Sequence, residues 1–179
     1  MRIIGGALKG KIIQVPAGFP SRPTTDFARE GLFNVLGNTK DFEQVRILDL
    51  YTGTGCISYE FFSRGANDIT MVDCHHRVIK NLLKTNERLN ATPSIRVIKS
   101  DALTFIKKIS ETYDLIFSDP PFDNRQHAEM VALIFERNIL RSEGILIVEH
   151  GKQTDLSQET YFKSSRKFGN VIFSFFSWE

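Results

Sequence analysis

The stretch YDLIFSDPPFDNRQ, residues 113–126, places an acid, two prolines and an aromatic ring directly after an apolar run. Proline lacks a backbone N–H and cannot donate to the ladder of a sheet, so a strand in this stretch must end at Asp119. The two prolines also fix φ, which removes local freedom around the acid. The pattern therefore predicts a carboxylate held rigidly at the end of a strand, followed closely by the ring of Phe122.

Other apolar runs also end in residues that suit a binding site. Residues 45–51 overlap the glycine-rich segment DLYTGTGCIS, and the runs at residues 68–73 and 94–101 each end in an acid. In doubly wound sheets ligands bind at the carboxyl ends of the strands, so these loops are predicted to face one site. The residues that we expect there are Asp49, Tyr51, Gly53, Gly55, Asp73 and Asp101.

The loops differ in the chemistry that they offer. The glycines let the backbone approach a ligand closely ahead of a helix. Asp73, 18 residues beyond Gly55, stands where an acid accepts hydrogen bonds from both ribose hydroxyls of an adenosine ligand, and Asp101 can accept from the adenine amino group. Both acids can instead cap the helices that follow them. Ser58 replaces the third glycine of the dinucleotide fingerprint, which argues against NAD.

The spacing of apolar residues predicts the scaffold that holds these loops. Short apolar runs predict five strands, at residues 45–51, 68–73, 94–101, 113–119 and 144–150. Helical spacing predicts helices between them, at residues 56–65, 76–90, 102–110 and 125–140. This alternation is typical of a doubly wound parallel sheet.

The two ends of the chain depart from the alternation. The β-rich runs at residues 161–168 and 171–178, separated by Gly169 and Asn170, predict an antiparallel hairpin. Runs at residues 2–4 and 11–15 predict a small amino-terminal β-hairpin, and a helix is expected at residues 26–37. The predicted fold is α/β: a Rossmann-like, doubly wound, mainly parallel seven-stranded sheet with an antiparallel carboxyl-terminal strand.

Length and composition predict one domain, residues 1–179, in which residues 1–23 form a hairpin and connector. With 41% apolar and 25% charged residues, the profile is that of an ordinary soluble globular protein. No stretch approaches the roughly 18–20 consecutive apolar residues of a membrane span, and the amino terminus lacks the apolar region of a signal peptide. We therefore expect a cytoplasmic protein with no membrane partner.

The two cysteines, Cys56 and Cys74, lack the spacing of a metal finger and are expected to be reduced thiols. Cys74, His75 and His76 are adjacent and point in different directions, and no second ligand pair follows. No metal is expected.

Positive charge is concentrated near the amino terminus. The whole chain has a net charge of +2, whereas residues 1–30 carry +3. The charged residues of this segment are Arg2, Lys9, Lys11, Arg22 and Arg29 against Asp26 and Glu30. Such an arm can be an electrostatic footprint for phosphates, or simply a solvated surface.

The joint order of glycine loop, two acids and proline turn resembles a class I S-adenosylmethionine-dependent methyltransferase. More narrowly, MRIIGGALKGK, SRPTTDFAREGLFNVLG, LDLYTGTGCISYEFFSRGA and SDPPF resemble the bacterial 16S rRNA guanine(966)-N(2)-methyltransferase family, the RsmD group, over essentially the whole chain. The RPTTDxxREGLFN pattern is the most specific part, because many amino-methylating enzymes share DPPF. Relatives tend to have phenylalanine, alanine and serine where this chain has Tyr51, Thr52 and Thr54, and often glutamate in place of Asp73.

The resemblance implies methyl transfer from S-adenosylmethionine to the exocyclic N2 of a guanine. Asp119 and the carbonyl of Pro120 would accept the two amine N–H bonds, Pro121 would help to hold them, and Phe122 would stack on the base. The cofactor would be bound by Asp49, Tyr51, Gly53, Gly55, Asp73, Cys74, Asp101, Ala102 and Ser118.

The expected partner is 16S rRNA or an assembly intermediate of the small ribosomal subunit, bound by a monomer. RNA phosphates would be contacted by Arg2, Lys9, Lys11 and Arg22, and either Asp26 or Arg29 would border the cofactor pocket. Three alternatives stay open: an adenine-N6 methyltransferase of DNA or RNA, a nucleotide-dependent oxidoreductase, and a non-catalytic RNA-binding module.

Overall fold

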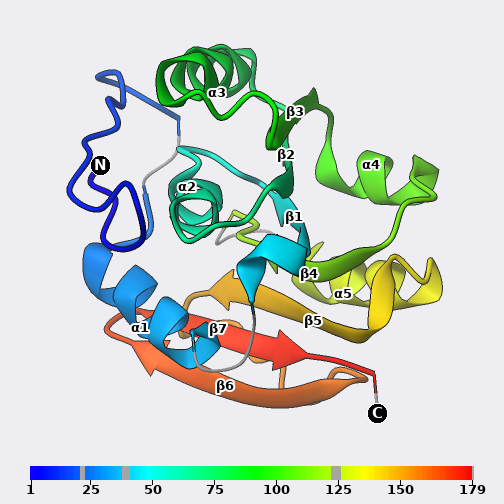
Figure 1. Ribbon diagram of the computed structural model, residues 1–179. Helices are drawn as coiled ribbons and strands as arrows, with labels where there is room; N and C mark the ends of the chain where they lie inside the picture. Colours follow the sequence, from blue (N-terminus) through cyan, green and yellow to red (C-terminus); the bar gives the residue numbers. More distant parts are fainter. Residues whose placement is uncertain (21–22, 38–40, 122–125, 179) are drawn as a thin grey trace.

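The central sheet has seven strands in the order β3-β2-β1-β4-β5-β7-β6 (Figure 1). The computed structural model describes residues 1–20, 23–37, 41–121 and 126–178. The strands are β1 (Arg46–Leu50), β2 (Asp68–Asp73), β3 (Ile95–Lys99), β4 (Tyr113–Ser118), β5 (Leu140–His150), β6 (Phe162–Phe168) and β7 (Val171–Phe176). β1 to β5 pair in parallel, whereas β7 pairs antiparallel with both β5 and β6. The predicted mainly parallel sheet with an antiparallel end is confirmed.

Helices cover both faces of the sheet. α1 (Asp26–Leu36), α2 (Cys56–Ser63) and α3 (His76–Leu89) pack on one face, and α4 (Ala102–Lys108) and α5 (Gln126–Glu136) pack on the other (Figure 1). A short 3-10 helix, η1 (Phe42–Gln44), precedes β1. Among the described residues, every helix is too short or too polar to cross a membrane.

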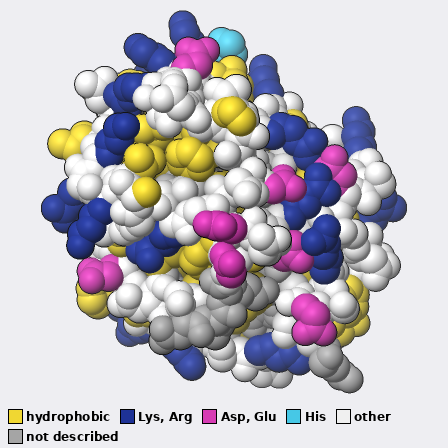
Figure 2. Space-filling view, viewed as in Figure 1, with side chains coloured by type: hydrophobic (Ala, Val, Ile, Leu, Met, Phe, Trp, Pro, Cys, Tyr) yellow, Lys and Arg dark blue, Asp and Glu magenta, His cyan; other side chains and the backbone are white. Residues whose placement is uncertain are grey.

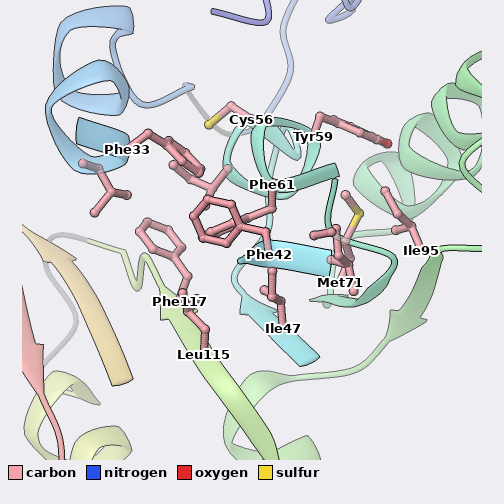
Figure 3. Close-up of a cluster of buried hydrophobic side chains, with 14 of the residues drawn as sticks. Phe33, Phe42, Ile47, Cys56, Tyr59, Phe61, Met71, Ile95, Leu115 and Phe117 are labelled. Carbon is pink, nitrogen blue, oxygen red and sulfur yellow. The ribbon is translucent and has the colours of Figure 1, made fainter. Parts of the chain in front are cut away.

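The two core layers follow from the alternation of side chains along the strands. Ile47 of β1 packs in the layer of α1, α2 and α3, and its neighbour Leu48 packs in the other layer. In the first layer, Phe33 of α1, Phe42 of η1 and Phe61 of α2 meet edge to face, with ring centroids 4.7 Å apart for Phe33–Phe61 and 5.2 Å for Phe42–Phe61 (Figure 3). This contact fixes α2, and therefore the loop from which it starts, against the sheet.

Two predicted boundaries are wrong: the end of the helix expected at residues 125–140 and the start of the strand expected at residues 144–150. The helix ends at Glu136, because Asn138 takes a left-handed φ of 53°, and β5 already begins at Leu140. The pairing of β5 with β4 shifts register between Tyr113 and Leu115, so the first part of β5 is irregular. Ile139 and Leu140 are apolar and buried, and that pattern fits the end of a helix or the start of a strand equally well.

The amino-terminal hairpin is shorter than predicted. Its two expected strands reduce to one antiparallel bridge, Arg2 with Ile12, supported by backbone hydrogen bonds such as Ile3 N to Lys11 O at 3.0 Å. Ile3 and Ile13 are nevertheless fully buried in the core. The segment is thus held by packing rather than by a sheet ladder.

The amino-terminal segment is also anchored to α2 by Glu60. This buried carboxylate accepts a hydrogen bond from the backbone N–H of Ile4 and faces two cations, Arg29 Nη1 at 3.8 Å and Arg64 Nε at 3.4 Å. The Arg29 side chain is completely buried and donates to the carbonyl of Arg2 at 2.8 Å. Glu60 therefore offsets the charge of the buried Arg29 guanidinium together with Asp26, whose Oδ1 lies 2.5 Å from Arg29 Nη2, and it joins residues 1–4, α1 and α2.

We expect Glu60→Ala to lower the free energy of unfolding by about 3–5 kcal/mol, because it leaves the Arg29 charge buried with less compensation. Urea unfolding followed by circular dichroism measures the change. Glu129→Ala is the control, since Glu129 pairs with Lys107 at 4.0 Å on the surface and such exposed pairs contribute under about 1 kcal/mol. Equal small losses in the two variants would contradict the assigned role of Glu60.

Candidate functional site

A cavity of about 680 Å³ lies at the carboxyl ends of β1, β2, β3 and β4. It sits where the strand order changes direction, because β2 and β4 flank β1 on opposite sides. The loop after each of these strands contributes to its wall, as the sequence predicted. Pro20 and Thr24, from the connector before α1, complete the wall, and the sequence pattern did not point to either residue.

The glycine loop after β1 has an unusual backbone. Tyr51, Gly53 and Gly55 all take left-handed φ values, of 58°, 54° and 77°. Gly53 lines the cavity, whereas Gly55 does not line it and is the N-cap residue of α2. A Cβ on Gly55 would lie 2.5 Å from the ring of Tyr59, so a side chain there would displace α2.

Thr52 fastens this loop to the neighbouring strand. Its hydroxyl donates to the Asp49 carbonyl at 2.7 Å and accepts from the backbone N–H of Val72 at 3.1 Å. The sequence marked Thr52 only as a departure from the family pattern. Its side chain bridges the ends of β1 and β2. This contact could not be predicted from the sequence, because it joins two segments 20 residues apart.

Asp73 holds the loop from the other side. One carboxylate oxygen accepts the backbone N–H of Gly53 at 3.0 Å, and the other accepts the N–H of His75 at 2.9 Å. The N-cap of α3 is His75, so Asp73 does not fill the capping position that was its alternative role. A carboxylate has about four acceptor sites, so Asp73 keeps acceptor capacity toward the cavity, which it lines.

The remaining predicted cofactor residues fall into two groups. Cys74, Asp101 and Ala102 line the cavity, and Asp101 also caps α4 by accepting the N–H of Thr104 at 2.8 Å. Ser118 does not line it, since this residue is fully buried and its hydroxyl donates to Met130 Sδ at 2.8 Å.

In the described part of the chain, one trio brings possible metal ligands together: Asp73, Cys74 and His75, with donor atoms within 4.8 Å of one another. These residues are consecutive at the junction of β2 and α3, where Asp73 accepts the backbone N–H of His75. The absence of a metal stays a prediction from the sequence.

The proline turn lies on the cavity wall. Asp119, Pro120 and Pro121 all line the cavity, and the backbone N–H of Asp119 donates to the Leu50 carbonyl at 3.4 Å. This bond sets the start of the turn beside the end of β1. Phe122 lies outside the described residues.

Carboxyl groups dominate the electrostatics of the cavity. Burial, together with the charges of Asp119 and Asp73, raises the pKa of Asp49 to about 7, although the Ser58 hydroxyl donates to it at 2.5 Å. Burial likewise raises the pKa of Asp119 to about 7. Glu149, at the end of β5, has a pKa well above its usual range because of burial and the nearby Asp119, opposed by a hydrogen bond from the Thr24 hydroxyl at 2.8 Å.

The charged side chains that line the described part of the cavity are mainly acidic. Its described lining includes Asp49, Asp73, Asp101 and Asp119 and contains no Lys or Arg. Nearby negative charges that raise one another's pKa favour a positively charged ligand and disfavour a phosphate. The cavity therefore suits a cation with an adenosine-like hydrogen-bonding part.

Those predicted residues of the amino-terminal arm that the structure describes lie outside the cavity. Arg2 is exposed and pairs with Asp26 at 3.4 Å, and neither Asp26 nor the buried Arg29 lines the cavity wall. Lys9 and Lys11 are exposed in the hairpin. Arg22 lies outside the described residues.

Comparison with known proteins agrees with this geometry. A family model described as "Conserved hypothetical protein 95" matches residues 1–177. The chain is 33% identical over 149 residues to "Ribosomal RNA small subunit methyltransferase D" of Escherichia coli strain K12, covering 83% of this chain and 74% of the relative. It is 30% identical over 159 residues to the protein of the same name from Haemophilus influenzae, covering 87% and 81%.

Solved structures show the same fold. That of the Escherichia coli protein yhhF superposes with a TM-score of 0.87 at 30% identity and covers 100% of this chain and 98% of its own. The SAH-bound Podospora anserina methyltransferase PaMTH1 superposes with a TM-score of 0.69 at 13% identity, covering 88% of this chain and 80% of its own, which is a likeness of fold alone.

The raised pKa of Asp49 predicts a pH dependence of stability. Between its ordinary pKa of 3.8 and about 7, the folded protein keeps a proton that the unfolded chain releases, so stability falls as pH rises through this window. The slope per group is on the order of 1 kcal/mol per pH unit. We expect Asp49→Asn to make the fall shallower, measured by urea unfolding at pH 5, 6, 7 and 8.

Glu136→Gln is the control, because Glu136 is exposed on α5, and it should keep the wild-type slope. A wild-type slope in Asp49→Asn would show that Asp49 does not carry the proton.

Proposed function

The chain belongs to the family described as Conserved hypothetical protein 95, the RsmD-like methyltransferases, and on this premise we propose that it uses S-adenosylmethionine to methylate N2 of guanine 966 in 16S ribosomal RNA. We further propose that it acts as a cytoplasmic monomer on 16S rRNA or on an assembly intermediate of the small subunit. The names of its relatives support ribosomal RNA methylation in general. The base and the atom rest on the family pattern and on the site.

One observation carries the cofactor assignment: the described lining of the cavity holds four aspartates and no Lys or Arg. S-adenosylmethionine carries a sulfonium and an ammonium group against a single carboxylate, so its net charge is positive and such a lining stabilises it. A dinucleotide brings a pyrophosphate, which it would repel. This distinction favours the methyltransferase over the oxidoreductase that was its alternative.

The residues of the cavity fit the parts of this cofactor. Asp73 has acceptor capacity left for the ribose hydroxyls after bonding Gly53 and His75. Asp101 would accept from the adenine amine beside Ala102, and the backbone of Gly53, at a left-handed φ of 54° that glycine adopts readily, would lie against the cofactor. Bound there, S-adenosylmethionine supplies an electrophilic methyl group.

Asp119 and Pro120 would prepare the guanine amine for transfer. The lone pair of this amine is delocalised into the ring, so the amine must be oriented before it can act as a nucleophile. Asp119 would accept one N–H bond and the Pro120 carbonyl the other, which stabilises positive charge that develops only in the transition state. With a pKa raised to about 7, the Asp119 carboxylate is also suited to accept the proton that the amine loses.

Adenine-N6 methylation is the second candidate, because the same acid and turn can hold an adenine amine. The RPTTD segment is the feature that favours guanine, and Thr24 of this segment lines the cavity and bonds to Glu149. This contact brings a family-specific segment to the place where the substrate base would enter.

We predict that cells lacking the gene lose one N2-methylguanosine from 16S rRNA, detected by mass spectrometry of nuclease fragments. Wild-type protein should restore it, and Asp119→Ala should not, because transition-state acceptors of this kind contribute roughly 100-fold or more to the rate. The purified variant should still bind S-adenosylmethionine with near wild-type affinity. Loss of an N6-methyladenosine instead would establish the second candidate, and full activity of Asp119→Ala would refute its role.

For Asp73→Ala we expect affinity for S-adenosylmethionine to fall roughly 10- to 100-fold, the effect of losing hydrogen bonds to a charged group. Titration calorimetry measures it. Asp68→Ala is the control, since Asp68 is an exposed acid at the opposite end of the same strand. Unchanged affinity in folded Asp73→Ala would overturn the ribose assignment.

A further inference from the structure

The exposed face of α3 carries a basic ridge, made of Arg77, Lys80, Lys84 and Arg88. At 100° per residue, these four side chains fall within an arc of about 80°, so they project from one side of the helix. All four are exposed, while Val78, Leu82 and Leu89 bury the opposite face in the core. Dark blue side chains lie over the α3 end of the molecule in Figure 2.

In the part of the chain that the structure describes, the charge of the ridge has no ion-pair partner. Within the described residues none of its four side chains makes an ion pair, in contrast to Arg2, Arg46, Arg96 and Arg141, each of which does. The only acid in α3 is Glu87. Four cations on one face of one helix therefore leave a concentrated positive field on a chain whose net charge is only +2.

The ridge forms one wall of a groove. A cavity of about 750 Å³ separates α3 from residues 14–16 of the amino-terminal segment, and its wall includes Lys84 and Arg88 together with one acid, Glu87. Asn81, also on its wall, has a buried side-chain N–H₂ group with no hydrogen-bond partner in the described structure. The segment that forms the second wall follows the hairpin that exposes Lys9 and Lys11.

We propose that the basic ridge of α3 and the groove beside it bind the phosphodiester backbone of the RNA substrate, outside the catalytic cavity. This inference rests on the proposed function for the identity of the RNA. Unpaired cations and an unsatisfied amide donor match the anionic, acceptor-rich backbone of a nucleic acid. The ridge spans about 16 Å along the helix, at 1.5 Å per residue, which suits several consecutive phosphates.

The position of the ridge relates it to the cavity. Arg77 follows Asp73 by four residues, so the ridge begins near the cavity mouth and leads away from it along α3. A strand whose base enters the cavity can therefore continue along the helix. An anionic membrane is a poorer match, because the apolar face of α3 is buried in the core rather than offered to lipid.

The test compares two double variants that remove the same charge. Lys84→Ala/Arg88→Ala changes the ridge, and Lys163→Ala/Lys167→Ala changes two exposed lysines of β6 that make no ion pair in the described structure. The probe is a fluorescent RNA hairpin carrying the 16S segment around the target guanine, titrated by anisotropy at several salt concentrations. Titration calorimetry with S-adenosylmethionine checks that both variants keep an intact cofactor site.

We expect the ridge variant to bind RNA about 10-fold more weakly and to lower the slope of log K against log salt by about 1.5, at roughly 0.7–0.9 per lost phosphate contact. The β6 variant should stay within about two-fold of wild type. A wild-type slope in the ridge variant, an equal loss in the β6 variant, or preference of the wild type for phosphatidylserine vesicles over RNA would each overturn the proposal.

Product analysis separates this inference from the proposed function. A ridge-dependent salt slope, with no N2-methylguanosine formed on the hairpin, on 16S rRNA or on small-subunit particles from cells lacking the gene, would support the RNA-binding groove and refute the proposed methylation. Methylation of the hairpin by the ridge variant with wild-type kcat/KM would support the proposed function and refute the groove.

Discussion

The burial of three carboxyl groups at the carboxyl edge of the sheet is the constraint around which the site is organised. Asp49, Asp119 and Glu149 come from different strands, and burial raises the pKa of each. Desolvation of such groups is costly, and hydrogen bonds from Ser58 to Asp49 and from Thr24 to Glu149 offset part of the cost. A cationic ligand would offset more of it, so the same burial that raises the pKa of these groups favours a positively charged ligand.

Rigid packing allows the fold to hold this arrangement. The aromatic contact of Phe33, Phe42 and Phe61 fixes α2, whose first turn follows the glycine loop, and Glu60 at the middle of α2 anchors the amino-terminal segment. Segments that are far apart in sequence are thus joined through one short helix. The glycine loop and the basic amino-terminal segment are parts of the same packed unit.

Much of this architecture could be predicted, because it follows from local patterns. Alternating strand and helix periods predicted the parallel sheet, and the residues after its strands, such as Asp73, Asp101 and Asp119, line one cavity. The predicted boundary between α5 and β5 was wrong, because the apolar Ile139 and Leu140 fit a helix end and a strand start equally well. The predicted hairpin was too long, because the burial of Ile3 and Ile13 holds that segment more than strand pairing does. Gly55, in the glycine loop, and Ser118, at the end of β4, do not line the cavity, since Gly55 packs against Tyr59 and the Ser118 hydroxyl donates to Met130.

By itself the sequence determined the order of the elements, the strand ends that carry the acids and the rigid turn at Asp119, because periodicity, glycine and proline act over a few residues. Only the tertiary structure decided that Thr52 bridges β1 to β2, that Thr24 reaches Glu149, and that two cations of the α3 ridge line a groove. These features depend on contacts between residues distant in the chain. Packing sets which side chains share an environment, and therefore which carboxyl groups are buried away from solvent. No local sequence pattern specifies that packing.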